Sequence, residues 1–128
     1  MVVVDTSVWV SVLRSPSSPE APLMAALLDA DEVALATPVR TELLSGVSAK
    51  DRAGLKRALS ALPVLYPTDE TWQLIDRWTE KTTKAGQHFG LGDLLVGALA
   101  AEAGALVWSL DSDFGRLEKL KLVQRYEP

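Results

Sequence analysis

The sequence has no cysteine, a single histidine and few aromatic residues, and each shortage excludes a class of function. Without cysteine there are no disulfide bonds, thiol nucleophiles or thiolate metal ligands, which fits a reducing compartment such as the cytoplasm. A catalytic pair of histidines is impossible, because His88 is the only one, and we expect it to be a bystander. Hydrolytic chemistry would therefore depend on carboxylates.

Long apolar runs and an excess of positive charge are also missing. The most apolar stretch, residues 94–110, is interrupted by Gly97, Glu102 and Gly104, and is shorter than the roughly 20 residues of a membrane-spanning helix. We therefore expect a soluble, cytoplasmic protein without membrane association. The net charge of −4 argues against a protein that coats nucleic acid. It argues less against an enzyme acting on nucleic acid, because a bound divalent cation reverses the local charge.

The 128 residues are 48% hydrophobic and 23% charged, so we expect residues 1–128 to form a single domain. Strand-like and helical segments alternate along the chain. The apolar, β-branched segments predict about five short strands, at 2–4, 32–36, 64–66, 105–110 and 122–126. Helices are predicted at 6–14, 21–30, from 37 onward, at 48–62, 69–84 and 93–103. This alternation predicts an α/β fold with a mostly parallel sheet.

Four carboxylates stand where such a fold binds ligands. Asp5 and Asp111 each follow a predicted buried strand, and open α/β sheets bind ligands beyond the carboxyl ends of their strands. Asp93 lies near the start of an apolar helix, and Glu42 lies about one turn into the helix that begins near Pro38. The helix dipole would favour an anion at both places.

Each acid taken alone has a structural explanation. Asp5, Asp93 and Asp111 would serve as helix caps, worth about 1 kcal/mol each, and Glu42 as an exposed residue beside a core stripe. Taken together, carboxylates about 4 Å apart repel by about 4 kcal/mol at an effective dielectric near 20, and Arg40 is the only base nearby in sequence. A hard cation such as Mg²⁺ or Mn²⁺ would neutralise them. The set therefore predicts metal-assisted hydrolysis of a phosphodiester.

The segments VVVDTSVWV, PVRTELLSG and GLGDLLVGALAAEAGALVWSLDSDF resemble the PIN domain in order and spacing. More narrowly, they are similar to the VapC-type toxins of bacterial and archaeal toxin–antitoxin pairs. The resemblance covers nearly the whole chain. It implies a three-layer α/β/α sandwich around a mostly parallel sheet, and a metal-dependent ribonuclease.

The resemblance also implies a set of site residues. It assigns the catalytic acids to Asp5, Glu42, Asp93 and Asp111. Of these, Asp5, Asp93 and Asp111 would hold one or two Mg²⁺ or Mn²⁺ ions. Glu42 would bind metal through water, or orient and deprotonate the attacking water.

Further polar residues surround these acids in the sequence. Thr6 or Ser7 would hydrogen-bond Asp5 or a phosphate oxygen, and Asp113 is an alternative to Asp111 as the fourth acid. Cations that would contact the RNA backbone near the mouth of the site are Arg40, Lys81, Lys84 and Arg116.

The resemblance implies three partners: an RNA substrate, a cognate VapB-type antitoxin and a second copy of the chain. The antitoxin would cover apolar grooves and block the acidic site with a basic side chain. Phosphatases of the haloacid dehalogenase type are disfavoured, because they need a second aspartate where this chain has Ser7. Response-regulator receivers are disfavoured because their paired acids are missing. A PIN-like domain that binds RNA or protein without cutting remains the alternative.

Overall fold

Four short parallel strands form the centre of the protein. The structure is a computed structural model, and it describes residues 1–128. The strands are β1 (Val2–Val4), β2 (Val33–Ala36), β3 (Val64–Leu65) and β4 (Leu106–Trp108), in the order β3-β2-β1-β4. Within the sheet, Val2 lies opposite both Val33 and Leu106. Strand β1 is therefore central and fully buried, which explains its unbroken run of valines.

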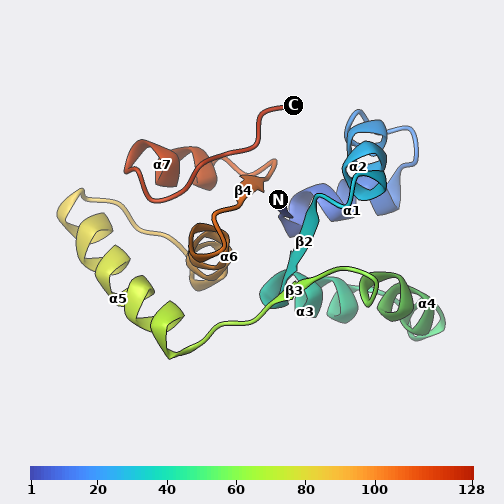
Figure 1. Ribbon diagram of the computed structural model, residues 1–128, viewed down its shortest axis with the longest axis horizontal. Coiled ribbons are helices and arrows are strands. Elements are labelled where there is room, and N and C mark those ends of the chain that lie inside the picture. The colour runs from blue at the N-terminus through green and yellow to red at the C-terminus, as the bar shows by residue number, and fades with distance from the viewer.

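Seven helices connect and cover these strands. They are α1 (Thr6–Arg14), α2 (Glu20–Asp29), α3 (Thr37–Gly46), α4 (Ala49–Leu59), α5 (Asp69–Lys84), α6 (Leu91–Glu102) and α7 (Asp113–Lys119). Figure 1 shows α1 and α2 on one side of the sheet, with α6 and α5 on the other. Helix α6 contacts β1, β2 and β4, and α5 packs against the outside of α6. The predicted three-layer α/β/α sandwich with a parallel sheet is confirmed. None of the helices is both long and apolar enough to cross a membrane.

The C-terminal part of the chain differs from the prediction in two ways. The fifth strand, expected at 122–126, is reduced to one parallel bridge between Arg125 and Val107, because β4 ends at Trp108 and gives a longer ladder no partner. The short helix α7 was not predicted, since seven residues carry too little periodicity. Phe114 and Leu117 of this helix are fully buried, so α7 is firmly attached to the core.

Two glycines in helices give a test of this packing. A Cβ at Gly97 in α6 would lie 3.1 Å from Val123 and 3.2 Å from the Trp78 ring of α5, whereas one at Gly54 in α4 would meet nothing. Gly97→Val should lower the free energy of unfolding by about 1–3 kcal/mol through overpacking. Gly54→Ala should raise it by about 0.5–1 kcal/mol through helix propensity. Urea unfolding measures both; a Gly97→Val midpoint at or above that of the wild type would contradict the close approach of α5 and α6.

Candidate active site and metal centre

A polar pocket of about 340 Å³ opens where β1 and β4 end. Its lining comes from the loops and helices that follow these strands, together with α3 and α6. The lining residues are Asp5, Thr6, Ser7, Glu42, Gly90, Gly92, Asp93 and Asp111. The four acids named from the sequence, far apart along the chain, are therefore brought together in one place with both predicted hydroxyl residues.

Asp5 is a buried lining residue of this pocket, and its side chain does not cap a helix. It occupies the N-cap position of α1, but its side chain makes no capping hydrogen bond. Instead, the Ser7 hydroxyl donates to Asp5 Oδ2 at 2.9 Å, and the Ser109 hydroxyl donates to the same oxygen at 2.8 Å. The other oxygen, Oδ1, has no hydrogen bond within the protein. The carboxylate is thus oriented by two hydroxyls with one oxygen free for a ligand.

Ser109 is the residue of this site that sequence reasoning missed. Its hydroxyl oxygen also accepts the N–H of Asp111 at 2.9 Å, so one side chain orients Asp5 and shapes the turn that carries Asp111. Ser7 acts in the same way, accepting the N–H of Leu110 at 3.0 Å. The predicted strand at 105–110 was too long: β4 stops at Trp108. The signal in the sequence that could have identified Ser109 was its place as a polar residue directly after an apolar strand.

Glu42 is held at the exposed mouth of the pocket by a hydroxyl rather than by a helix dipole. It is the sixth residue of α3, beyond the first turn in which the dipole acts, so that part of the prediction was wrong. The Thr6 hydroxyl donates to Glu42 Oε1 at 3.1 Å. Thr6 and Ser7 therefore serve different acids: Ser7 bonds Asp5, and Thr6 bonds Glu42.

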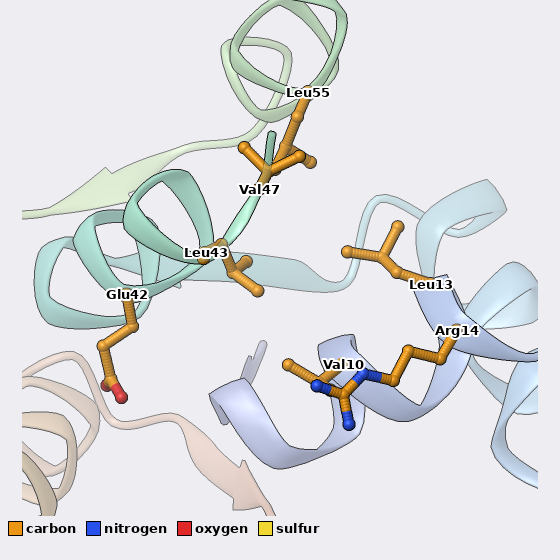
Figure 2. A pocket seen from close by; sticks show the side chains of 8 residues that line it. Val10, Leu13, Arg14, Glu42, Leu43, Val47 and Leu55 are labelled. Atoms are coloured by element: carbon orange, nitrogen blue, oxygen red, sulfur yellow. The ribbon is translucent and has the colours of Figure 1, made fainter. Parts of the chain in front are cut away.

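An apolar groove of about 210 Å³ lies on the other side of Glu42, between α1, α3 and α4 (Figure 2). Its lining residues are Val10, Leu13, Arg14, Glu42, Leu43, Gly46, Val47 and Leu55. Figure 2 shows the Arg14 side chain extending from α1 into the groove. Leu13, one of the residues that line this groove, is 53% exposed. Because Glu42 lines both hollows, the groove adjoins the acidic pocket.

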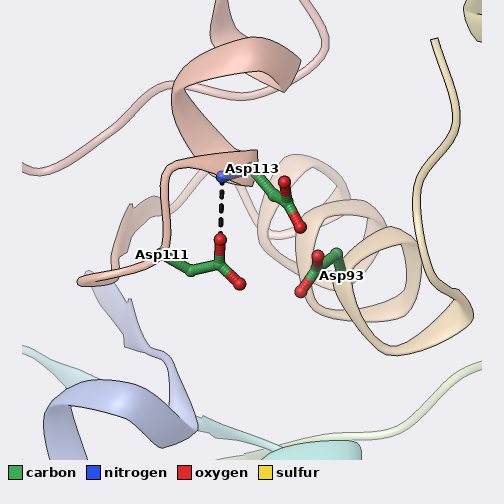
Figure 3. Close-up of side chains that lie close together, drawn as sticks. All are labelled: Asp93, Asp111 and Asp113. Carbon is green, nitrogen blue, oxygen red and sulfur yellow. Dashed lines mark hydrogen bonds between the residues drawn. The ribbon is translucent and has the colours of Figure 1, made fainter.

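Three aspartates come together on the α6 and α7 side of the pocket (Figure 3). Carboxylate oxygens of Asp93, Asp111 and Asp113 lie within 4.8 Å of one another. Asp111 Oδ1 accepts the N–H of Asp113 at 2.9 Å, but the N-cap residue of α7 is Ser112, so Asp111 is not the cap of this helix. Asp113 pairs with Arg116 at 2.7 Å and does not line the pocket. A hydrogen bond from Arg116 is the main cause of the lowered pKa of Asp113.

Asp93 carries the strain of this crowding. It is the third residue of α6, which begins at Leu91 rather than at Asp93 as predicted, and its side chain makes no capping bond. Burial, a hydrogen bond with Asp113, and the negative charges of Asp111, Asp113 and Asp5 raise the pKa of Asp93 from 3.8 to about 7. The helix N-terminus would lower this pKa, so burial and repulsion outweigh it. The site thus requires additional positive charge to keep all its acids ionised.

Comparison with known proteins assigns the family. Residues 2–120 match the PIN domain family. The chain belongs to this family. It is 29% identical to ribonuclease VapC11 of Mycobacterium tuberculosis, over 97% of this chain and 96% of that protein.

Solved structures of low sequence identity share the PIN fold. FitAcB of Neisseria gonorrhoeae matches with a TM-score of 0.79 and 19% identity, over 100% of this chain and 98% of that one. VapBC2 of Rickettsia felis, bound to a DNA fragment from its promoter, matches with a TM-score of 0.78 and 16% identity, over 98% of both chains.

The donor set of this PIN domain suits a hard divalent cation. Every polar side chain of the pocket ends in oxygen, and neither histidine nor cysteine is among the lining residues. Oxygen ligands are preferred by Mg²⁺ and Mn²⁺, whereas Zn²⁺ and Cu²⁺ favour nitrogen or sulfur. Oδ1 of Asp5 is available as a ligand for such an ion, and the positive charge of the ion would offset the negative charge around Asp93.

The predicted RNA-contacting cations lie in different settings. Arg116 donates hydrogen bonds within the protein, and Lys81 and Lys84 are exposed in the last turn of α5. Arg40 lines a pocket of about 220 Å³ on α3 and α4 together with Arg52, and no carboxylate lines it. His88 is exposed, and its side chain makes no hydrogen bond.

The raised pKa of Asp93 predicts how the stability of the metal-free protein depends on pH. Folded protein binds a proton at Asp93 more tightly than unfolded protein does, so protonation of Asp93 adds to the free energy of unfolding. This stabilising contribution is fully present below about pH 4 and is lost as the pH rises towards 7. In EDTA, melting temperature should fall between pH 5 and 8 more steeply for wild type than for Asp93→Asn. The exposed Asp76→Asn is the control and should follow the wild type; parallel curves for all three proteins would contradict the assignment.

Proposed function

We propose that this PIN-domain protein is a metal-dependent endoribonuclease, acting as the toxin of a VapBC-type toxin–antitoxin pair, and that residues 1–128 fold as a single domain. The observation that carries the proposal is the convergence of four acids from four separate chain segments in one polar pocket. Supporting it, the relative at 29% identity is named a ribonuclease. The single histidine excludes a mechanism built on a histidine pair.

Asp5, Asp93 and Asp111 are the residues that would hold Mg²⁺ or Mn²⁺, as one ion or two. All three line the pocket, and none of them forms an ion pair within the protein, whereas Asp113 is already paired with Arg116. When bound, such an ion neutralises phosphate oxygens and lowers the pKa of a coordinated water. Ser7 and Ser109 keep the Asp5 carboxylate in a single orientation for this task.

Glu42 is the residue best placed to take a proton from the attacking water. It lies at the exposed mouth of the pocket, and Thr6 orients its carboxylate. The water oxygen attacks phosphorus, and the bond from phosphorus to the 3′-oxygen breaks. The leaving oxygen takes up a proton, so the products are a 5′-phosphate and a 3′-hydroxyl. Arg40 and Arg52 would contact a neighbouring phosphate of the RNA backbone from their own pocket.

The groove between α1, α3 and α4 would bind the antitoxin. A segment lying on its apolar residues reaches Glu42 at one end, and a basic side chain placed there would enter the acidic pocket. A toxin–antitoxin complex from Klebsiella pneumoniae contains a chain of the same fold. A homodimer, implied by the resemblance, stays a prediction.

Substitution of the acids tests the catalytic assignment. Asp5→Asn, Asp93→Asn and Asp111→Asn should each lower cleavage at least about 100-fold, because each removes charge that holds the cation. Asp113→Asn should retain activity within about tenfold, and Asp76→Asn, a change at an exposed residue of α5, should match the wild type. The assay is cleavage of a pool of structured RNAs in Mg²⁺, Mn²⁺ or EDTA, with mapping of product ends.

Two results of this assay would count against the proposal. Equal cleavage by Asp5→Asn and wild type would mean that the pocket is not the active site. Tight RNA binding without cleavage in either metal would favour the alternative, a PIN-like domain that binds without cutting.

A substitution in the groove separates inhibition from catalysis. Leu13→Asp places a charge on the exposed apolar wall of the groove, so a cognate VapB-type antitoxin should inhibit it at least about tenfold more weakly. RNA cleavage without antitoxin should be unchanged. Tyr66→Asp, a change of the same kind at a 68% exposed residue away from the groove, is the control. Equal inhibition of all three proteins would place the antitoxin elsewhere.

A further inference from the structure

Arg116 connects two chain segments that meet at the acidic pocket. Its Nη2 donates to Asp113 Oδ1 at 2.7 Å and to the His88 carbonyl at 3.3 Å. Its Nη1 donates to Gln87 Oε1 at 2.5 Å. The guanidinium carbon also lies 4.2 Å from the centroid of the buried Phe89 ring. Four contacts from one partly exposed side chain are more than a surface ion pair provides.

The two connected segments are those that carry the crowded aspartates. Residues 87–89 lead directly into α6, whose third residue is Asp93. Arg116 itself belongs to α7, which follows the turn containing Asp111. Figure 3 shows the carboxylates of Asp93 and Asp111 pointing toward one another. The guanidinium therefore holds the two sides of the aspartate cluster together at a point outside the pocket.

The contacts of Arg116, which we call a clamp, oppose the electrostatic repulsion between the aspartates of these two segments. Carboxylate oxygens of Asp93, Asp111 and Asp113 lie within 4.8 Å of one another, and no other cation is paired with them. Arg116 supplies positive charge to Asp113 and a planar fork that reaches Gln87 and His88 at the same time. A lysine keeps the charge but lacks the fork and the stacking face.

We propose that Arg116 is a positioning residue, which clamps residues 87–89 onto α7 and thereby keeps Asp93 and Asp111 at the separation that binds Mg²⁺ or Mn²⁺. It contacts neither the attacking water nor the RNA. This inference rests on the metal site of the proposed function. Its consequence is specific: loss of the clamp weakens metal binding, whereas the metal-loaded enzyme still works.

Titration of Mn²⁺ into the whole protein tests the proposal by calorimetry and by the shift in melting temperature, without reference to RNA. Arg116→Met should raise the Kd for Mn²⁺ by about 10- to 100-fold, as loss of groups that orient metal ligands does. Arg116→Lys should fall between Arg116→Met and wild type. Arg125→Met is the matched control, because Arg125 is 39% exposed, pairs with Glu118 and Glu127, and lies against Gly115 of α7; its Kd should be unchanged.

Two further readouts separate positioning from a general loss of stability. At saturating Mn²⁺, kcat of Arg116→Met for RNA cleavage should return to within a few-fold of wild type. Amide hydrogen exchange at residues 87–93 should be faster in Arg116→Met and unchanged in Arg125→Met. If Arg116→Met does not fold, Gln87→Ala removes one contact of the clamp and should still raise the Kd several-fold.

The outcomes distinguish this inference from the proposed function. Wild-type binding of Mn²⁺ with an equal Kd for Arg116→Met would overturn the positioning role alone. Equal loss of melting temperature in Arg116→Met and Arg125→Met, with Mn²⁺ affinity unchanged, would overturn it in the same way. No Mn²⁺ binding by the wild type would overturn both the clamp and the metal site on which it rests.

Discussion

Mutual repulsion of carboxylates is the constraint on which this structure depends. Asp5, Asp93 and Asp111 lie around one pocket with Glu42 at its mouth. Burial, together with the repulsion of the neighbouring carboxylates, raises the pKa of Asp93 to about 7. Water would separate such groups in a flexible chain. Here the hydroxyls of Ser7 and Ser109 hold Asp5, Thr6 holds Glu42, and Arg116 holds the segments around Asp93 and Asp111. Strain of this kind is characteristic of functional sites.

The parallel sheet makes the convergence possible. Strand β1 is central and pairs with β4, so their carboxyl ends lie side by side, and the N–H of Asp5 donates to the Trp108 carbonyl at 2.8 Å. Helix α6 crosses the same strands and brings Asp93 to the same edge. The buried Phe114 attaches α7, and with it the aspartate turn, to the core. The free energy gained by packing this core therefore offsets the repulsion among the carboxylates at the polar edge of the sheet.

Net negative charge is compatible with action on a polyanion when the charge is reversed locally. The chain carries −4 overall, and its acidic pocket would repel RNA without a cation. If the proposed metal dependence holds, a partner that places positive charge at Glu42 would take up the negative potential that otherwise attracts the cation. The apolar groove adjoins the pocket at that residue, so a partner bound along it would reach the site without needing to enter from the RNA side.

The sequence by itself determined the α/β fold and the convergence of Asp5 and Asp111, because strand and helix periodicity are local and carboxylates after buried strands converge at one edge of a parallel sheet. Asp93 and Glu42 stand on helices, so their place at the pocket depended on how α6 and α3 pack. Tertiary structure decided the rest: Ser109 bonds Asp5 across 104 residues, Arg116 pairs with Asp113 and leaves Asp111 in the pocket, and the last strand shrinks to one bridge. These contacts join distant segments through side-chain geometry and charge. Local periodicity contains no record of either.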